Sequence, residues 1–162
     1  MNENLVRARD NFIEGIGHLS TTVGLSRVTG QLYATLFFSN SPLCLDDIVE
    51  RLKISKGSAS VNIRTLERWG LVRKIWVKGS RKDFYEAEVD FEKIINGELA
   101  AQVRRKLGRT LDTLTETQNL IKEIPEDLNQ EDKKTLEFYQ KRLQRMKEIY
   151  KLAEGFLESI LS

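Results

Sequence analysis

Residues 55–77 read SKGSASVNIRTLERWGLVRKIWV, and the spacing of the apolar residues changes partway along them. The first half places apolar side chains at helical steps of three and four, at Ala59, Ile63 and Leu66. Ser55 stands where a helix N-cap is expected, and Gly70 stands where helices commonly end. The second half, 71–77, is rich in β-branched and aromatic residues, which favour a strand. This stretch therefore predicts a helix over 56–69 followed at once by a strand.

The neighbouring residues complete a small supersecondary unit. A basic turn, KGSRK at 78–82, follows the expected strand, and DFYEAEV at 83–89 predicts a second strand that closes a hairpin. Upstream, 45–52 has apolar residues at helical spacing behind two acidic residues, whose charge suits the positive end of a helix. Two short helices joined by a tight turn, with a hairpin directly after them, predict a winged helix-turn-helix.

Long helical patterns flank this unit. Apolar residues recur at steps of three or four over 5–23 and again from 26 to about 38. A further helical stretch over 91–124 ends before Pro125, and 130–161 has the most regular pattern in the chain. With only 2 Pro and 10 Gly among 162 residues, few positions interrupt these helices. The expected fold is mainly α, with a small β-hairpin wing and long N- and C-terminal helices.

The last helix predicts an assembly. About thirty residues of helix span roughly 45 Å, which is too long to be buried on one small domain. Its heptad seam must face another helix, either the 91–124 stretch, a second copy, or both. We expect a homodimer interface built by Phe12, Ile16, Leu19, Leu136, Tyr139, Leu143, Met146, Tyr150, Leu157 and Ile160. The expected division is 1–25 as an N-terminal dimerisation helix, 26–89 as a winged helix-turn-helix domain and 90–162 as C-terminal dimerisation helices.

The 56–69 helix has an outer face opposite its apolar side. The composition of that face suits a major-groove reader, since arginine binds guanine or phosphate and hydroxyls bind either. Gly57 would let the backbone approach DNA closely near a helix N-terminus that attracts phosphate. A solvated face with no ligand is the plainer alternative. The candidate DNA-binding residues here are Ser55, Lys56, Gly57, Ser58, Ser60, Val61, Arg64, Thr65 and Arg68.

The turn at 78–82 is a candidate minor-groove probe. A narrow minor groove concentrates negative potential and attracts an inserted arginine, which makes Arg81 the candidate. The alternative is a basic turn that contacts only phosphates. The candidate wing residues are Lys78, Ser80, Arg81 and Lys82.

Charge is segregated along the chain. Between Arg51 and Lys82 there are ten basic residues and one acid, Glu67, a net charge of +9. Because the whole chain carries +2, the remainder carries −7. A single-sign block on an ordered unit indicates a polyanion partner, which could be DNA, RNA or an anionic membrane. A membrane binder should also expose apolar residues beside the basic ones, and the hairpin tip lacks them, so we expect double-stranded DNA and no membrane.

Composition argues against several other classes. A single cysteine, Cys44, permits no disulfide within the chain and fits a cytoplasmic protein. Cys44 and His18 cannot supply a zinc ligand set, so neither a metal nor a cofactor is expected, and Cys44 is better interpreted as a small buried residue than as a redox sensor. No apolar run approaches the roughly 18 residues of a membrane span, and no signal peptide is recognisable. No nucleophile–base pair or phosphate-binding loop is present, so we expect no enzyme.

Several of these motifs together resemble MarR-type transcriptional regulators, and in particular their GbsR-like branch. The resemblance rests on SKGSAS at 55–60, LERWGLVR at 66–73 and GSRKDFYEA at 79–87. It implies a homodimer whose first helix and last two helices form the interface, with two winged domains reading a pseudo-palindrome. Two positions depart from the family pattern. Ser80 replaces an acid that often precedes the wing arginine, and Cys44 replaces the usual threonine or serine cap.

The expected function is sequence-specific DNA binding by a transcriptional regulator, a repressor acting as a homodimer on a pseudo-palindromic operator. The resemblance also implies a small-molecule effector that relieves repression, and the sequence leaves this open. The alternative is a winged-helix protein-interaction module of a larger assembly, without sequence-specific DNA binding. The basic block argues against that alternative, because such a module has no need for ten cations and one acid.

Overall fold

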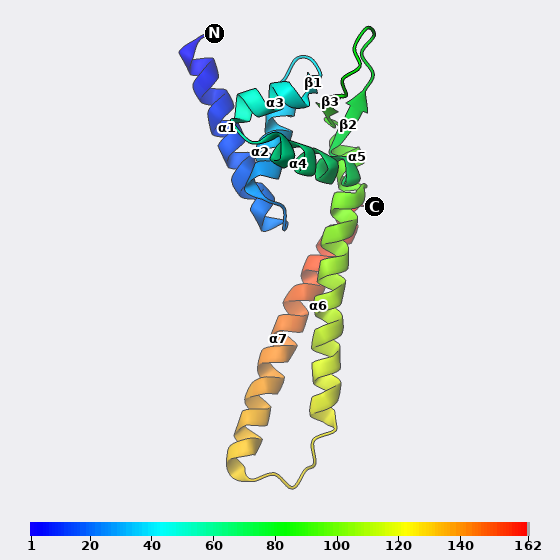
Figure 1. Ribbon diagram of the computed structural model, residues 1–162. Coiled ribbons are helices and arrows are strands. Elements are labelled where there is room, and N and C mark those ends of the chain that lie inside the picture. The colour runs from blue at the N-terminus through cyan, green and yellow to red at the C-terminus, as the bar shows by residue number, and fades with distance from the viewer. Residues whose placement is uncertain (162) are drawn as a thin grey trace. The chain divides into compact units, whose positions relative to one another are not determined.

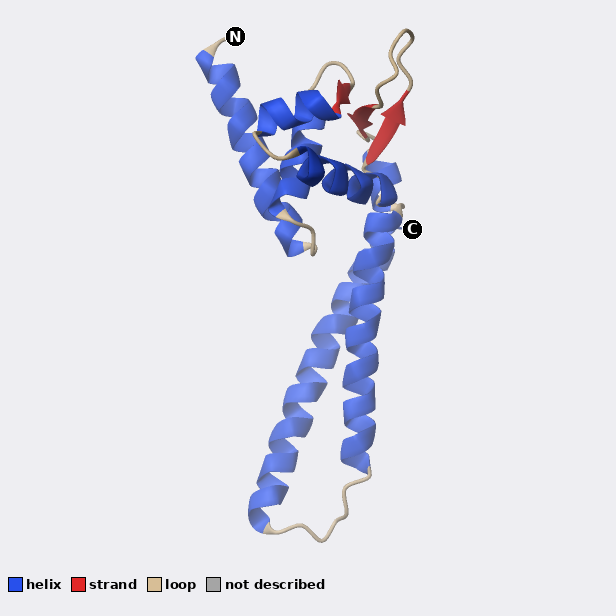
Figure 2. Cartoon of the chain, in the orientation of Figure 1, coloured by secondary structure: helices blue, strands red, loops and turns tan. Residues whose placement is uncertain are grey.

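The computed structural model describes residues 1–161, which form helices and one small sheet (Figure 1, Figure 2). The chain divides into two compact units, residues 1–100 and the residues from 101 onward. Ser162, the last residue of the expected C-terminal region, lies outside the described residues. The elements are α1 (Glu3–Thr22), α2 (Arg27–Phe37), β1 (Leu43–Cys44), α3 (Leu45–Leu52), α4 (Lys56–Arg68), β2 (Val72–Ile75), β3 (Phe84–Ala87), α5 (Phe91–Ile95), α6 (Glu98–Lys122) and α7 (Gln130–Leu161).

The first unit is built around a core that α2, α3 and α4 share. Leu32 of α2, Ile48 of α3, and Ile63 and Leu66 of α4 are its largest fully buried side chains. Burying each of them stabilises the fold by roughly 1.5–3 kcal/mol. The predicted helix-turn-helix is confirmed as α3 and α4. The apolar face of α4 that the spacing predicted packs into the core.

A three-stranded antiparallel sheet with the strand order β1-β3-β2 completes the winged domain. The predicted hairpin is confirmed as β2 and β3, in which Val72 pairs with Ala87. The strand β1 adds to the other edge of β3, with Leu43 opposite Tyr85. The sequence did not predict this third strand, because two residues are too few to show a strand period.

The helix α1 crosses α2 within the first unit. Gly30 of α2 is buried at the crossing, where an added Cβ would lie 2.5 Å from the carbonyl oxygen of Ile16. The Ser20 hydroxyl donates a hydrogen bond to the carbonyl oxygen of Ser26 at 2.7 Å, which ties the end of α1 to the start of α2. Gly24 turns the chain between them with φ of +84°. Ser26 caps α2, its hydroxyl oxygen accepting the amide N–H of Thr29 at 3.1 Å.

The helical stretch predicted over 91–124 is wrong in one respect, because the structure breaks it into α5 and α6. Asn96 ends α5, and an added Cβ at the following Gly97 would lie 2.8 Å from the carbonyl oxygen of Lys93. This close approach favours glycine. The apolar spacing continues across the break, so periodicity alone could not reveal it.

The second unit is an antiparallel helical hairpin formed by α7 and most of α6. Gln118 of α6 contacts two residues of α7. Its amide donates to the Gln144 side chain at 3.3 Å, and its carbonyl oxygen accepts from Lys147 at 2.9 Å. Leu114 and Ile121 are the buried residues of α6. The heptad seam of 130–161 was expected to face the 91–124 stretch, a second copy or both, and its pairing with α6 is present.

Candidate nucleic-acid interface

The helix α4 exposes its predicted outer face, because its inner face is held in the core. Arg64, Arg68 and Val61 are exposed. At the N-terminus Ser55 caps the helix, its hydroxyl oxygen accepting the amide N–H of Ser58 at 3.0 Å. One side of α4 is thus a basic surface bordered by half-buried hydroxyl side chains, those of Ser58, Ser60 and Thr65.

Gly57 lies exposed in the first turn of α4. An added Cβ there would meet only the Ser55 hydroxyl oxygen, at 4.0 Å, so the protein leaves this space open. Glycine stabilises a helix less than alanine does, and no contact within the described chain requires it here. An open surface at a helix N-terminus permits close approach of another molecule's backbone.

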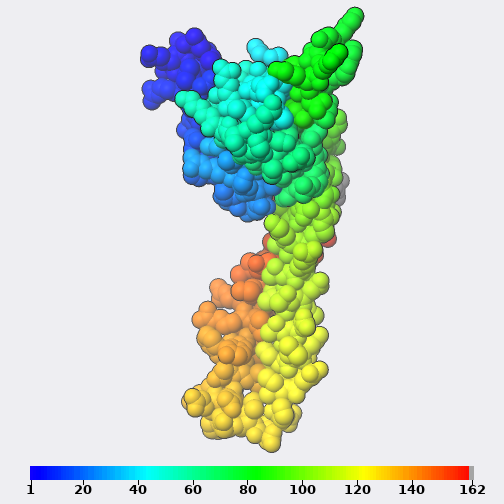
Figure 3. Space-filling model, viewed as in Figure 1, coloured from blue at the N-terminus to red at the C-terminus, as the bar shows by residue number. Residues whose placement is uncertain are grey.

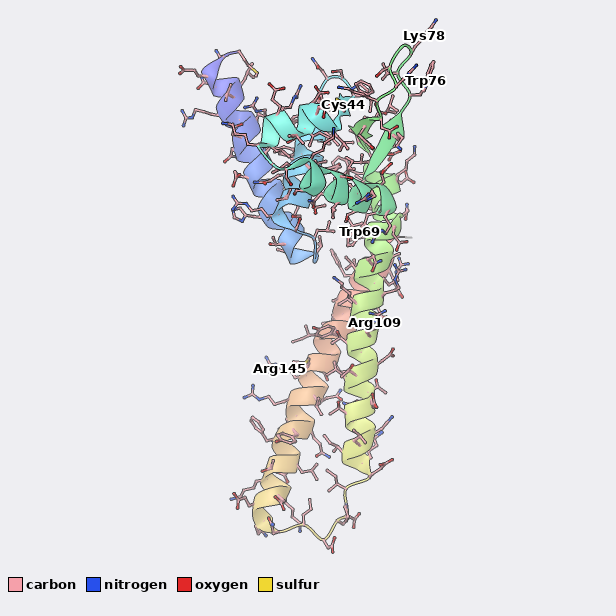
Figure 4. The ribbon with its side chains drawn as sticks, viewed as in Figure 1. Cys44, Trp69, Trp76, Lys78, Arg109 and Arg145 are labelled. Carbon is pink, nitrogen blue, oxygen red and sulfur yellow. The ribbon has the colours of Figure 1, made fainter. Side chains whose placement is uncertain are left out.

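A tight turn shapes the tip of the wing. The amide of Ser80 donates to the carbonyl oxygen of Val77 at 3.2 Å, and Gly79 has φ of +84°, as the third position of a type II turn requires. The Ser80 hydroxyl oxygen accepts the amide of Lys82 at 3.1 Å, so Ser80 supports the turn. The hairpin projects from the rest of the first unit in Figures 1 and 3, and Figure 4 shows Lys78 at its tip.

The basic turn at 78–82 carries no apolar side chain, as expected, but an exposed one lies just before it. Trp76 follows β2 and is 80% exposed. The sequence placed Trp76 inside the expected strand 71–77, and strand aromatics usually pack on a sheet face. The strand ends one residue earlier, at Ile75, so the indole extends beyond the paired part of the hairpin.

Asp46, in the first turn of α3, links the start of α4 to the wing. Its carboxylate accepts a hydrogen bond from Lys82 at 2.8 Å and another from Lys56 at 3.1 Å. These bonds from Lys82 and Lys56 hold the pKa of Asp46 below its ordinary value. The structure therefore brings two of the candidate lysines, Lys56 and Lys82, to one acid. The charge count did not reveal this contact, since Asp46 lies outside the basic block in sequence.

Other cations of the block also have acidic neighbours. Arg73 forms an ion pair with Glu86 at 2.5 Å, and Lys74 forms one with Asp83 at 3.1 Å. These acids follow the block in sequence, and strand pairing returns them to it. Of the six candidate cations on α4 and the wing, four form no ion pair within residues 1–161: Arg64, Arg68, Lys78 and Arg81.

The described chain shows neither a metal cluster nor a membrane span. Within residues 1–161, no three His, Cys, Asp or Glu side chains are placed to share a metal ion. None of the helices described has both the length and the apolar character needed to cross a bilayer. Cys44 is buried, as expected for a small apolar side chain, and Asp47 caps α3 by accepting its backbone amide at 2.9 Å.

Known proteins share this sequence pattern and fold. No family model matches the chain. It is 28% identical over 157 residues to the HTH-type transcriptional repressor GbsR of Bacillus subtilis (strain 168), covering 95% of this chain and 86% of that protein. It is 27% identical over 162 residues to the HTH-type transcriptional repressor OpcR of the same organism, covering 92% and 87%. The crystal structure of a transcriptional regulator, 18% identical, matches with a TM-score of 0.61 over 95% of each chain, which confirms the fold.

The chain is similar over most of its length to GbsR-like winged-helix regulators of the MarR type. The two Bacillus relatives are named as repressors, and their match extends over most of this regulator rather than over the winged domain alone. Transcriptional regulation is a non-enzymatic role.

The regulator also contains a polar contact that the sequence did not reveal. The side-chain oxygen of Asn62 on α4 accepts hydrogen bonds from Thr29 at 2.5 Å and from Ser26 at 3.0 Å. Its amide nitrogen donates to the carbonyl oxygen of Ser58 at 2.8 Å. Asn62 thereby ties α4 to the first turn of α2. Its partners lie 33 and 36 residues earlier, beyond the reach of any local pattern.

The candidate dimerisation residues of α1 differ in accessibility. Phe12 stacks on Phe38 with ring centroids 4.3 Å apart, so this side chain already has a partner within the regulator. Ile16 is half-buried, and Leu19 is exposed. Leu19 is thus the candidate of this helix that is most accessible to a second subunit.

The seam of α7 is only partly covered. Leu136, Leu143, Tyr150 and Leu157 are half-buried, whereas Tyr139, Met146 and Ile160 are exposed. A second apolar row, which we call the outer row, was not predicted, although its spacing is also helical. It consists of Phe138, Ile149, Leu152 and Phe156, whose exposure ranges from 54% to 75%.

Proposed function

We propose that this regulator is a sequence-specific, DNA-binding repressor that acts in the cytoplasm as a homodimer on a pseudo-palindromic operator. One observation carries the proposal. Arg64 and Arg68 on α4, and Lys78 and Arg81 on the wing, have no acidic partner within residues 1–161. Four such cations on one ordered unit favour binding to a polyanion, because its phosphates could pair with them. The proposal assigns no catalytic activity to the chain.

In this proposal α4 enters the major groove. Arg64 and Arg68 reach guanine edges or phosphates, and the exposed Val61 contacts a thymine methyl group. The hydroxyls of Ser58, Ser60 and Thr65 border the same face. Thr65 donates its hydroxyl proton to the Val61 carbonyl oxygen at 3.1 Å, so its free lone pairs suit an amino group of a base.

The wing contacts the adjacent minor groove. Arg81 lies in the turn that Gly79 and the Ser80 hydrogen bonds shape. The guanidinium forms no ion pair within residues 1–161, and a narrow minor groove would attract it. Lys78 at the tip contacts the flanking phosphates.

The homodimer brings together two such units. We propose that residues 1–25 and 90–162 build its interface and that 26–89 bind DNA. The exposed outer row of α7 supports this division, because large apolar rows on soluble monomers are uncommon. A symmetric dimer on one face of DNA would hold its two α4 helices about 34 Å apart, one turn of duplex.

Selection of bound duplexes from a random pool, followed by titration at several salt concentrations, tests DNA binding. With about eight phosphate contacts per dimer, the log–log slope of affinity against salt should be near −7. Absence of binding to any duplex at low salt would contradict the proposal. It would favour the alternative of a winged-helix protein-interaction module.

Arg64→Ala tests the base-reading role. We expect it to weaken operator binding by about 1–3 kcal/mol and to weaken random DNA less. Arg109→Ala is the matched control, because Arg109 is also exposed but lies on α6 in the other compact unit (Figure 4). Equal losses on operator and random duplex would show that Arg64 contacts only phosphate.

A small-molecule effector completes the proposal. A cavity of about 560 Å³ in the first unit is lined by α1, α2 and α3, including Asp10, Asp47, Glu50 and Phe38. Its volume falls within the usual range for small-molecule sites. A molecule bound there would contact both α1 and the helix-turn-helix. Thermal-shift screening with candidate osmolytes, followed by DNA titration with each hit, tests this role.

A further inference from the structure

Trp76 has no role in the function proposed so far, and its environment is unusual. Among the large apolar side chains of residues 1–160, only Met1 is more exposed. Its indole takes part in none of the ring–ring or cation–π contacts found in residues 1–161. The other tryptophan, Trp69, is instead half-buried against the core. A single exposed apolar side chain is common on protein surfaces, so the support and the charges around Trp76 decide whether it belongs to a binding surface.

The hairpin holds Trp76 in a defined position. Ile75, the residue before it, pairs with Phe84 across the ladder, and Lys74 forms an ion pair with Asp83. The turn that begins at Val77 closes the hairpin directly after it. Figure 4 shows Trp76 on the projecting part of the hairpin, near Lys78 and well away from Trp69. The indole is thus carried outward on an ordered support.

The charges around Trp76 indicate its partner. Lys78 and Arg81, both without acidic partners in the described chain, lie in the same wing. Asp46 joins the wing, through Lys82, to the start of α4, through Lys56, so the wing and α4 serve one surface. A membrane surface would need a larger apolar face than one indole. A duplex suits the whole surface, because apolar side chains beside arginine are a common means of entering a minor groove.

We propose that Trp76 is a DNA-contacting residue of the wing, whose indole packs against the sugars or a base step of the minor groove beside Arg81. This proposal rests on the proposed DNA binding and adds an aromatic contact to it. The contact would add affinity that salt weakens little, because an indole displaces no counterions from phosphate.

Fluorescence offers a direct test, because the chain has only two tryptophans. In a Trp69→Phe protein, Trp76 is the sole indole. We expect its emission to change, and its quenching by acrylamide to fall, when a selected operator duplex is added. A Trp76→Phe protein, which keeps Trp69, is the control and should respond little. A complex that forms by gel shift while Trp76 emission and quenching stay unchanged would overturn the proposal.

A binding series supplies the second test. Trp76→Ala should weaken operator binding about tenfold, the scale of one lost aromatic contact, and Trp76→Phe should retain most of it. Thermal stability should stay unchanged, because the side chain is exposed. Equal affinities of wild type and Trp76→Ala would refute the role of Trp76 and leave DNA binding intact. Failure of the wild type to bind any duplex would refute the proposed function itself. Trp76 emission that responds to anionic vesicles but not to duplex would assign the indole to a membrane.

Discussion

Two residues in the first turns of α3 and α4, Asp46 and Gly57, affect the charge and the shape of the proposed DNA-binding surface. Gly57 keeps open a space that the protein does not fill, and Asp46 neutralises part of the charge that Lys56 and Lys82 provide. Neither residue contributes a charged or donating side chain to DNA. Gly57 lacks the methyl group that alanine would place on this surface. The Asp46 carboxylate lowers the positive potential of the surface.

Gly57→Ala should therefore separate folding from binding. The new methyl group has space in the free protein, so we expect thermal stability to stay level or rise, by about 1 kcal/mol at most. Operator affinity should fall, because the methyl group would occupy the space that the DNA backbone approaches. Gly108→Ala in α6 is the matched control, as its Cβ meets nothing within 4 Å. An unchanged operator affinity for Gly57→Ala would remove the close-approach role.

Asp46→Asn should make DNA binding stronger and less selective. The substitution frees Lys56 and Lys82 from their shared acid, so affinity for random duplex should rise and the salt slope should steepen by about one. Because the pKa of Asp46 is lowered, the wild-type carboxylate stays ionised at neutral pH, and the comparison can be made there. Glu50→Gln removes an equal charge from the same helix without either lysine contact. Equal changes in the two variants would indicate a general charge effect.

At the scale of elements, α4 is held from two sides. The core fixes its inner face, and Asn62 ties its flank to Ser26 and Thr29 of α2. The helix α2 in turn approaches α1 closely at Gly30. A change in the α1–α2 crossing would therefore reach α4 through a short series of contacts.

Gly30→Ala tests this crossing. The new Cβ would lie 2.5 Å from the Ile16 backbone oxygen, so the helices must separate. We expect a loss of about 1–3 kcal/mol in the free energy of unfolding, measured by urea titration, as for other overpacked sites. Gly15→Ala on α1 has open space around its Cβ and should cause no such loss. Equal stability of the two variants would show that the crossing adapts freely.

The proposed dimer depends on α7. Its seam is partly covered and its outer row is exposed, so the helix has apolar surface left after the contacts that it makes within the described chain. A second copy is the occupant that the proposed function requires. Its contact would set the distance between the two α4 helices and hence the spacing of operator half-sites.

Leu152→Glu together with Phe156→Glu should disrupt this dimer. Buried carboxylates without partners are strongly disfavoured at an interface, so sedimentation should show a monomer. Operator affinity should then fall steeply, while a single half-site should still bind weakly. Gln140→Glu adds a charge at an exposed polar position of the same helix and should leave the dimer intact. A stable dimer of the double variant would place the interface elsewhere.

Much of this protein is determined by local sequence. Apolar spacing, the Ser55 cap and the Gly70 helix end predicted α2, α4 and the hairpin, because these signals act between residues a few positions apart. The same spacing missed the break at Gly97, since a close backbone approach leaves no trace in a hydrophobic period. It also missed β1, which exists only as a partner of β3.

The tertiary structure alone decided which charges and rings remain available. The sequence showed ten cations in a block, but it could not show that Asp46 reaches Lys82 from 36 residues away. Nor could it show that strand pairing places Glu86 beside Arg73, or that β2 ends before Trp76 and leaves the indole exposed. Local patterns depend on neighbours along the chain. The partners of a charge or an aromatic ring depend on which distant segments the fold brings within a few ångströms.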